Sequence, residues 1–161
     1  MKKMDIIQTI LETGTFLSFS AMIITVLLQV ITRALFPDKS FVWTEEAARF
    51  FFIYAVAFAA PLAMKKQEYV NVDIILNALS ANAKKALELI IHAITIIFFS
   101  IVFFQAIKFA KLGIGQTSPS MSIPMYISYF STTIMIVFII YYAIGNLLKD
   151  VVSFKERGDI K

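Results

Sequence analysis

The chain has 161 residues, of which 59% are hydrophobic and 16% are charged, and it contains no cysteine. This apolar share is far above that of a soluble domain and leaves no room for a separate soluble domain. The lack of cysteine excludes a disulfide framework, a thiolate metal site and a cysteine nucleophile. The net charge of +4 does not indicate nucleic-acid binding, because the basic residues stand at the ends of apolar segments, where membrane topology explains them.

Four segments are apolar enough to cross a bilayer, and none carries a charge at its middle. A hydrocarbon core of about 30 Å requires about 20 apolar residues in a helix. The sequence therefore predicts an all-α integral membrane protein with a single four-helix transmembrane domain over residues 1–161. The expected helices cover residues 8–35, 44–65, 83–112 and 124–149.

Signals at the expected helix ends support these ranges. The first helix is expected to stop before Phe36-Pro37-Asp38, since proline does not continue a helix. Thr44 is a plausible N-cap of the second helix, with Glu45 and Glu46 in the first turn, where the helix dipole favours carboxylates. Pro124 suits the first turn of the last helix.

A shorter helix is expected between the second and third spans, at residues 71–81. Its apolar residues recur with helical period, and Asn71 is a candidate cap with Asp73 in the first turn. The segment is too short and too polar to span, so we expect an interfacial helix on the cytoplasmic surface. Together with the 16 phenylalanines of the chain, it suggests a bound phospholipid on that side.

Lysine and arginine are divided unequally between the two sides of the expected domain. The side of the N-terminus has an excess of about two to one, which predicts that both termini are cytoplasmic. That side carries Lys2, Lys3, Lys65, Lys66, Lys84, Lys85, Lys149, Lys155, Arg157 and Lys161. The opposite side carries Arg33, Lys39, Arg49, Lys108 and Lys111.

The densest group of polar residues lies at the outer ends of the first two helices. It comprises Arg33, Trp43, Glu45, Glu46 and Arg49. Glu45 and Arg49 are four residues apart, in the order that favours an ion pair on one helix face. The group is compatible with a docking patch for a partner. The residues alone favour interfacial anchoring, in which the tryptophan lies at headgroup depth, the arginines snorkel and the glutamates cap the helix.

The remaining polar residues predict neither catalysis nor a metal site. Glu88 and His92 are four residues apart and are compatible with a proton relay, or with a solvated glutamate and a histidine that bonds a neighbouring helix or a headgroup. Gln29, Gln105 and Asn146 are expected to form interhelical hydrogen bonds. The alternative is that they line the pore of a self-sufficient oligomeric channel or exporter. Since transport sites typically use broken helices in repeated halves, the lone chain is not expected to move a polar solute.

Several motifs follow one another along the chain in an order similar to that of a known family. An arginine ends the first helix, and it is followed by Trp43-x-Glu45-Glu46-x-x-Arg49, Val70-Asn71-Val72-Asp73 and Ser118-Pro119-Ser120-Met121-Ser122-Ile123-Pro124. Over nearly its whole length the chain resembles the small membrane subunit, DctQ-like, of tripartite ATP-independent periplasmic (TRAP) transporters. Two positions depart from the family pattern: Tyr69 stands where histidine is frequent, and Tyr126 stands where tryptophan is frequent.

The resemblance implies a function for the whole assembly. It implies a bacterial inner-membrane chain that packs against a large membrane subunit, which holds the sodium and substrate sites. A periplasmic substrate-binding protein would deliver an organic acid, such as a C4-dicarboxylate or a sialic acid. The chain itself would be an accessory scaffold without catalytic residues, substrate site, metal or cofactor of its own. Candidates for docking or subunit contact are Arg33, Trp43, Glu45, Glu46, Arg49, Ser118 and Tyr126, with Tyr69, Asn71 and Asp73 at the cytoplasmic interface.

Overall fold

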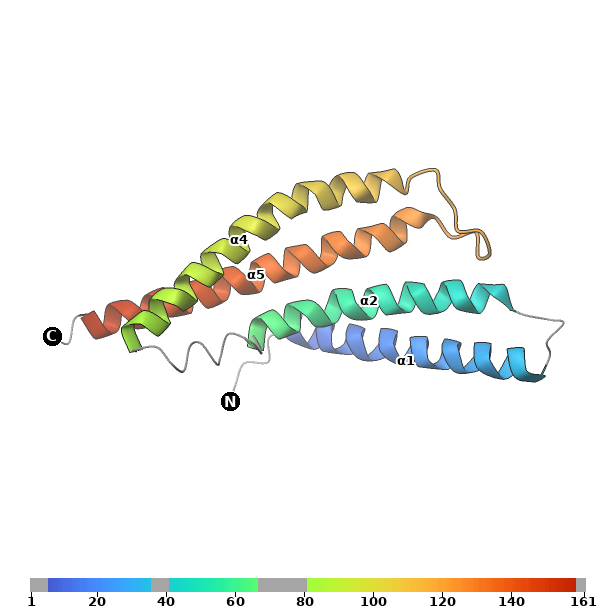
Figure 1. The fold of residues 1–161 in the computed structure, drawn as a ribbon, viewed down its shortest axis with the longest axis horizontal. Helices are drawn as coiled ribbons and strands as arrows, with labels where there is room; N and C mark the ends of the chain where they lie inside the picture. Colours follow the sequence, from blue (N-terminus) through green and yellow to red (C-terminus); the bar gives the residue numbers. More distant parts are fainter. Residues whose placement is uncertain (1–5, 36–40, 67–80, 159–161) are drawn as a thin grey trace.

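The computed structural model of the chain describes residues 6–35, 41–66 and 81–158 (Figure 1). These residues form the long helices α1 (Ile6–Leu35), α2 (Val42–Lys66), α4 (Ala81–Leu112) and α5 (Met125–Gly158). Each of the four is long and apolar enough to cross a membrane. The prediction of an all-α membrane fold with four spanning helices is therefore confirmed.

The helix bounds agree with the expected ranges at some ends and differ at others. The ranges 8–35 and 83–112 end at the same residues as α1 and α4, whereas α5 continues past residue 149 to Gly158. The interfacial helix expected at 71–81 lies outside the described residues, apart from Ala81, which begins α4. Tyr69, Asn71 and Asp73 also lie outside them.

The start of α2 corrects one expectation. Thr44 is not the N-cap, because α2 begins at Val42 and Thr44 lies in its first turn. The carbonyl oxygen of Phe41 accepts hydrogen bonds from the Thr44 backbone N–H at 3.1 Å and from its hydroxyl at 2.7 Å. The buried hydroxyl of Thr44 thus bonds backward to the residue before the helix, and Phe41 takes the capping position.

The four helices lie side by side in one row, in the order α1, α2, α5, α4 (Figure 1). Among the described helices, only neighbours in this row bring their backbones into contact. In the spanning windows, 28% of the residues of α2 and 39% of those of α5 are buried, against 6% in α1 and in α4. Helices α2 and α5 are therefore central, and α1 and α4 form the two edges.

The packing of the central helices follows from small and hydroxyl-bearing residues. Ala57 of α2 and Ser131 of α5 are buried, and such residues let membrane helices approach closely. The Tyr54 hydroxyl donates a 2.7 Å hydrogen bond to the Ile127 carbonyl and so joins α2 to the start of α5. Gly14 likewise lets α1 approach α2 closely, because a Cβ at this position would lie only 2.9 Å from the ring of Phe58.

The row of helices has two ends that differ in their connections. The terminal end is the one at which α1 begins and α5 finishes, and the loop end is the one at which α4 is connected to α5 (Figure 1). The apolar core lies toward the terminal end and consists of Leu11, Met64, Ile139, Tyr142 and Ala143. This core fixes the spacing of α1, α2 and α5 where a cluster of polar side chains also gathers.

Candidate functional site

At the loop end, Glu46 of α2 joins the connection between α4 and α5. Its Oε2 atom accepts hydrogen bonds from the backbone N–H of Ser120 at 3.1 Å and of Met121 at 2.9 Å. Hydrogen bonds to an ionised acceptor are about twice as strong as those between neutral groups. The carboxylate therefore holds the connection against the first turns of α2, a contact between segments far apart in the sequence.

The connection also has an internal framework built on Ser118. Its N–H donates to the Ile123 carbonyl at 2.8 Å, and its Oγ accepts from the Ile123 N–H at 3.3 Å. The backbone N–H of Ser122 donates to the Ser118 carbonyl at 3.1 Å, and Ser122 has a positive φ of 54°. Since Ser118 is only 3% exposed, it shapes the connection from inside.

The exposed part of the loop end is formed by the first turns of α2. Arg49 donates to Glu45, so the ion pair expected from their spacing is present. The two side chains are 70% and 50% exposed, respectively, and an ion pair in water contributes little to stability. Trp43, in the first turn of α2, is also exposed.

The structure brings only some of the predicted site residues together. Glu46, Arg49 and Ser118 line one cavity of about 420 Å³, whose other lining residues include Tyr129 and Thr132. Arg33 and Glu45 instead line a small cavity of about 40 Å³ between the end of α1 and the start of α2. Tyr126 lies apart from both and lines a third cavity with Lys111.

At the terminal end, polar side chains tie α1, α2 and α5 together. Asn146 is buried, and its Nδ2 donates to the Met64 carbonyl at 2.8 Å. The Lys65 Nζ donates to Gln8 Oε1 at 2.7 Å and lies 5.2 Å from the centre of the Tyr142 ring. The bond of Asn146 confirms the expectation of an interhelical hydrogen bond.

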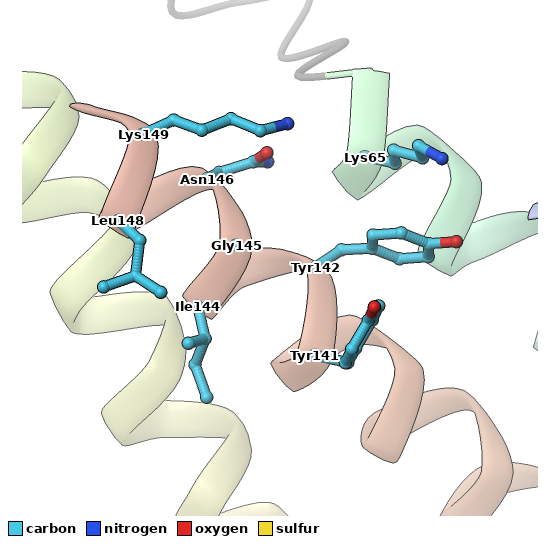
Figure 2. A pocket seen from close by; sticks show the side chains of 8 residues that line it. All are labelled: Lys65, Tyr141, Tyr142, Ile144, Gly145, Asn146, Leu148 and Lys149. Atoms are coloured by element: carbon cyan, nitrogen blue, oxygen red, sulfur yellow. The ribbon is translucent and has the colours of Figure 1, made fainter. Parts of the chain in front are cut away.

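A cavity of about 400 Å³ opens beside these contacts (Figure 2). Two lysines, Lys65 from α2 and Lys149 from α5, lie at its border, with Tyr141 and Tyr142 on the side toward the middle of α5. This cavity was not predicted from the sequence. The only signal for it was the basic residues that flank the spans, and membrane topology alone was a sufficient explanation of those.

His92 of α4 is 2% exposed, and its Nε2 lies 3.2 Å from Oδ2 of Asp150 in α5. The expectation that His92 bonds a neighbouring helix is confirmed. Local spacing suggested Glu88 as a partner, whereas Asp150 is far along the chain and approaches only because α4 packs on α5. The pair therefore links the two helices near the terminal end.

Gln29, Gln105 and Asn146 do not come together within one chain. Gln29 and Gln105 lie on the two edge helices, α1 and α4, and Asn146 lies on α5 near the terminal end. Among the described residues, no group of three histidine, aspartate or glutamate side chains is placed to hold a metal ion.

The bond of Asn146 is expected to contribute to the stability of the chain. We expect Asn146→Ala to lower the free energy of unfolding by about 1–2 kcal/mol, near the upper end for interhelical hydrogen bonds in membranes. Thermal unfolding in mild detergent measures this change. Gln105→Ala is the control, because Gln105 is exposed, and it should change stability by less than about 0.5 kcal/mol. Equal effects of the two substitutions would contradict a stabilising role for the bond between Asn146 and Met64.

The fold and these polar clusters define a multi-pass helical membrane protein. Residues 22–153 match the family described as tripartite ATP-independent periplasmic transporters, DctQ component. The chain belongs to this family, as the order of its motifs indicated. It is a family of small permease subunits of transporters and not of enzymes.

Two relatives resemble the chain over different lengths. It is 25% identical to a TRAP transporter small permease protein of Haemophilus influenzae over 159 residues, which cover 99% of this chain and 94% of that protein. It is 34% identical to the isethionate TRAP transporter permease protein DctMQ of Oleidesulfovibrio alaskensis over 90 residues, which cover 55% of this chain. The matched segment spans only 14% of that longer relative.

Proposed function

We propose that this chain is the accessory subunit of a sodium-coupled secondary transporter that imports an organic acid. In this proposal it packs against a large membrane subunit that carries the substrate and sodium. A periplasmic substrate-binding protein docks on the outer surface of both. The chain lies in the bacterial inner membrane with its terminal end in the cytoplasm, because the basic residues are concentrated on that side.

The arrangement of the helices in a single row is the main support for proposing an accessory subunit. A solute pathway through a protein must be enclosed by helices on all sides, and a row of α1, α2, α5 and α4 encloses none. Of the three amide residues considered for a pore, Asn146 is bonded between helices, and Gln29 and Gln105 lie on the edge helices. A transport site is therefore assigned to the partner subunit.

Family membership supports the rest of the assignment. One relative has a name that combines the M and Q components, and this chain matches 14% of its length. A relative that carries both components in one protein supports a close contact between this chain and a large partner. That relative is named for isethionate, an organic sulfonate. The substrate class is therefore proposed as a small organic acid, such as a C4-dicarboxylate, a sialic acid or a related anion.

The outer surface proposed for docking is the loop end. Glu46 fixes the connection between α4 and α5, and the exposed pair of Glu45 and Arg49 lies within one turn of it on α2. A fixed backbone with exposed charges of both signs suits a soluble partner that must dock and leave. Arg33 and Trp43 extend this surface at the edge formed by α1 and α2.

Reconstitution tests the proposal. Purification of the tagged chain in mild detergent is expected to retain a near-stoichiometric larger membrane protein, identified by mass spectrometry. In liposomes, organic-acid uptake should require that partner, the receptor and a sodium gradient, and this chain alone should give background uptake. Glu45→Gln should leave the ratio of sodium to substrate unchanged. Uptake or conductance by this chain alone would instead support the self-sufficient oligomeric channel.

A further inference from the structure

The cavity of about 420 Å³ at the loop end lies along α5. Ser128, Tyr129 and Thr132 of α5 line it, together with Phe50 of α2 and Phe109 of α4. Since α2 and α4 both pack on α5 and their backbones make no contact with each other, the cavity is a trough along α5 between two flanking helices. Its volume is within the range of sites that bind small molecules.

Two hydroxyl groups that line this trough lack a partner within the described part of the chain. Ser128 is only 5% exposed, and neither its hydroxyl nor that of Thr132 makes a hydrogen bond to another described residue. Thr15 and Thr25 of α1 differ, because each donates to the carbonyl four residues before it, at 2.8 and 2.7 Å. An unbonded hydroxyl costs free energy in a membrane span. Both hydroxyls therefore indicate a ligand with acceptor oxygens.

The outer end of the trough carries one group of each charge. Glu46 binds the connection through Oε2, and its Oε1 accepts no hydrogen bond from the described residues. Arg49 has five N–H donors, of which one bonds Glu45 in the described chain. Glu46 and Arg49 both line the cavity, and their charges are opposite. The complementary ligand is therefore neutral overall and carries a cationic and an anionic group.

The polarity of the trough decreases with depth. Glu46 and Arg49 lie in the first two turns of α2, and Phe50 and Ile53 follow toward the middle of its span. The seven residues from Glu46 to Ile53 cover about 10 Å along a helix. Charges at the membrane border, hydroxyls beside them and apolar walls further inside match the order of a phospholipid, which has a headgroup, ester carbonyls and acyl chains.

We propose that this cavity binds a phospholipid of the leaflet at the loop end whose headgroup carries a phosphate and a primary ammonium. The phosphate accepts hydrogen bonds from Arg49, and the ammonium donates to Oε1 of Glu46. The ester carbonyls accept from the hydroxyls of Ser128 and Thr132, and one acyl chain continues past Phe50. The inference rests on this cavity alone and holds whether or not the chain takes part in organic-acid transport.

Native mass spectrometry of the purified full chain tests the headgroup. Phosphatidylethanolamine should be retained more tightly than phosphatidylcholine, whose ammonium has no N–H, and phosphatidylglycerol, which has no cation. Arg49→Gln should weaken phosphatidylethanolamine binding about fivefold, the equivalent of about 1 kcal/mol for one basic residue. Lys111→Gln is the matched control, because it removes the same charge from an exposed position at the loop end of α4 that lines a different cavity. It should leave binding unchanged.

Two further variants test the α5 side of the trough. Ser128→Ala removes one hydroxyl and should weaken phosphatidylethanolamine binding about threefold, the average effect of one interhelical hydrogen bond in a membrane. Its melting temperature in detergent should not change, because this hydroxyl has no bond within the described chain. Thr132→Leu fills part of the space and should abolish retention of the lipid. If Thr132→Leu fails to fold, Arg49→Gln still decides the question.

Three results would overturn the proposal. The first is retention of phosphatidylcholine or phosphatidylglycerol equal to that of phosphatidylethanolamine. The second is an equal effect of Arg49→Gln and Lys111→Gln on phosphatidylethanolamine binding. The third is a Thr132→Leu chain that keeps the lipid but no longer co-purifies with a larger membrane protein, since the cavity would then be a contact with that protein.

Discussion

Gly113→Ala is expected to destabilise the chain by about 2–3 kcal/mol, because the added methyl group meets backbone and not a movable side chain. Its Cβ would lie 2.5 Å from the nitrogen and 2.7 Å from the Cα of Tyr126. Relief requires α5 to move away from the end of α4. That movement strains the 2.9 Å bond from the Met125 N–H to the Gln116 carbonyl. The melting temperature in detergent, followed by tryptophan fluorescence, should fall by about 5–10 °C.

Gly145→Ala is the matched control for this prediction. It adds the same methyl group inside a helix, where the Cβ has open space. Alanine should therefore leave stability unchanged or raise it by up to about 1 kcal/mol, the difference in helix propensity. A similar loss of stability in both variants would show that close backbone approach at Gly113 is not the cause.

Glu46→Ala is expected to reduce receptor-dependent uptake about tenfold while assembly with the large subunit is kept. The substitution removes the acceptor of two backbone hydrogen bonds from Ser120 and Met121. Bonds to a charged acceptor contribute about 1.5–3 kcal/mol each when buried, and the partly exposed position of Glu46 lowers this to about 1–2 kcal/mol in total. The connection should then leave the conformation that we propose for receptor docking more often. Uptake measured against receptor concentration should show a raised half-saturation value.

Two further variants isolate the role of the carboxylate of Glu46. Glu45→Gln removes the same charge one residue away and breaks only the exposed pair with Arg49, so uptake should change less than twofold. Glu46→Gln keeps an acceptor oxygen and should fall between the wild-type chain and Glu46→Ala. If Glu45→Gln and Glu46→Ala reduced uptake equally, net charge at the loop end would explain the effect and the contact with the connection would not.

The features predicted correctly from the sequence are mostly those that depend on residues close together in the chain. The four spans follow from their apolar length, and the pair of Glu45 and Arg49 follows from their spacing on one helix. The N-cap at Thr44 was wrong, although it too is local. Its hydroxyl has two uses, to cap a helix or to bond backward within one, and the sequence does not distinguish them.

The contacts that could not be predicted depend on how the helices pair. Glu46 was expected in the first turn of its helix, within a group for docking or interfacial anchoring, whereas its oxygen binds the connection before α5. His92 was considered with Glu88, four residues away, while Asp150 approaches from another helix. Both contacts require the neighbours α2–α5 and α4–α5, and hydrophobic periodicity specifies which face is apolar but not which helix covers it.

The order of helices in the row also determines how the chain can assemble. The pairs α1–α2 and α4–α5 are each formed by helices adjacent in sequence, and only the pair α2–α5 joins distant segments. Each hairpin can therefore form as soon as its second helix enters the membrane, with little loop-closure entropy to overcome. We therefore expect the two preformed hairpins to dock last, through Tyr54, Asn146 and the apolar core.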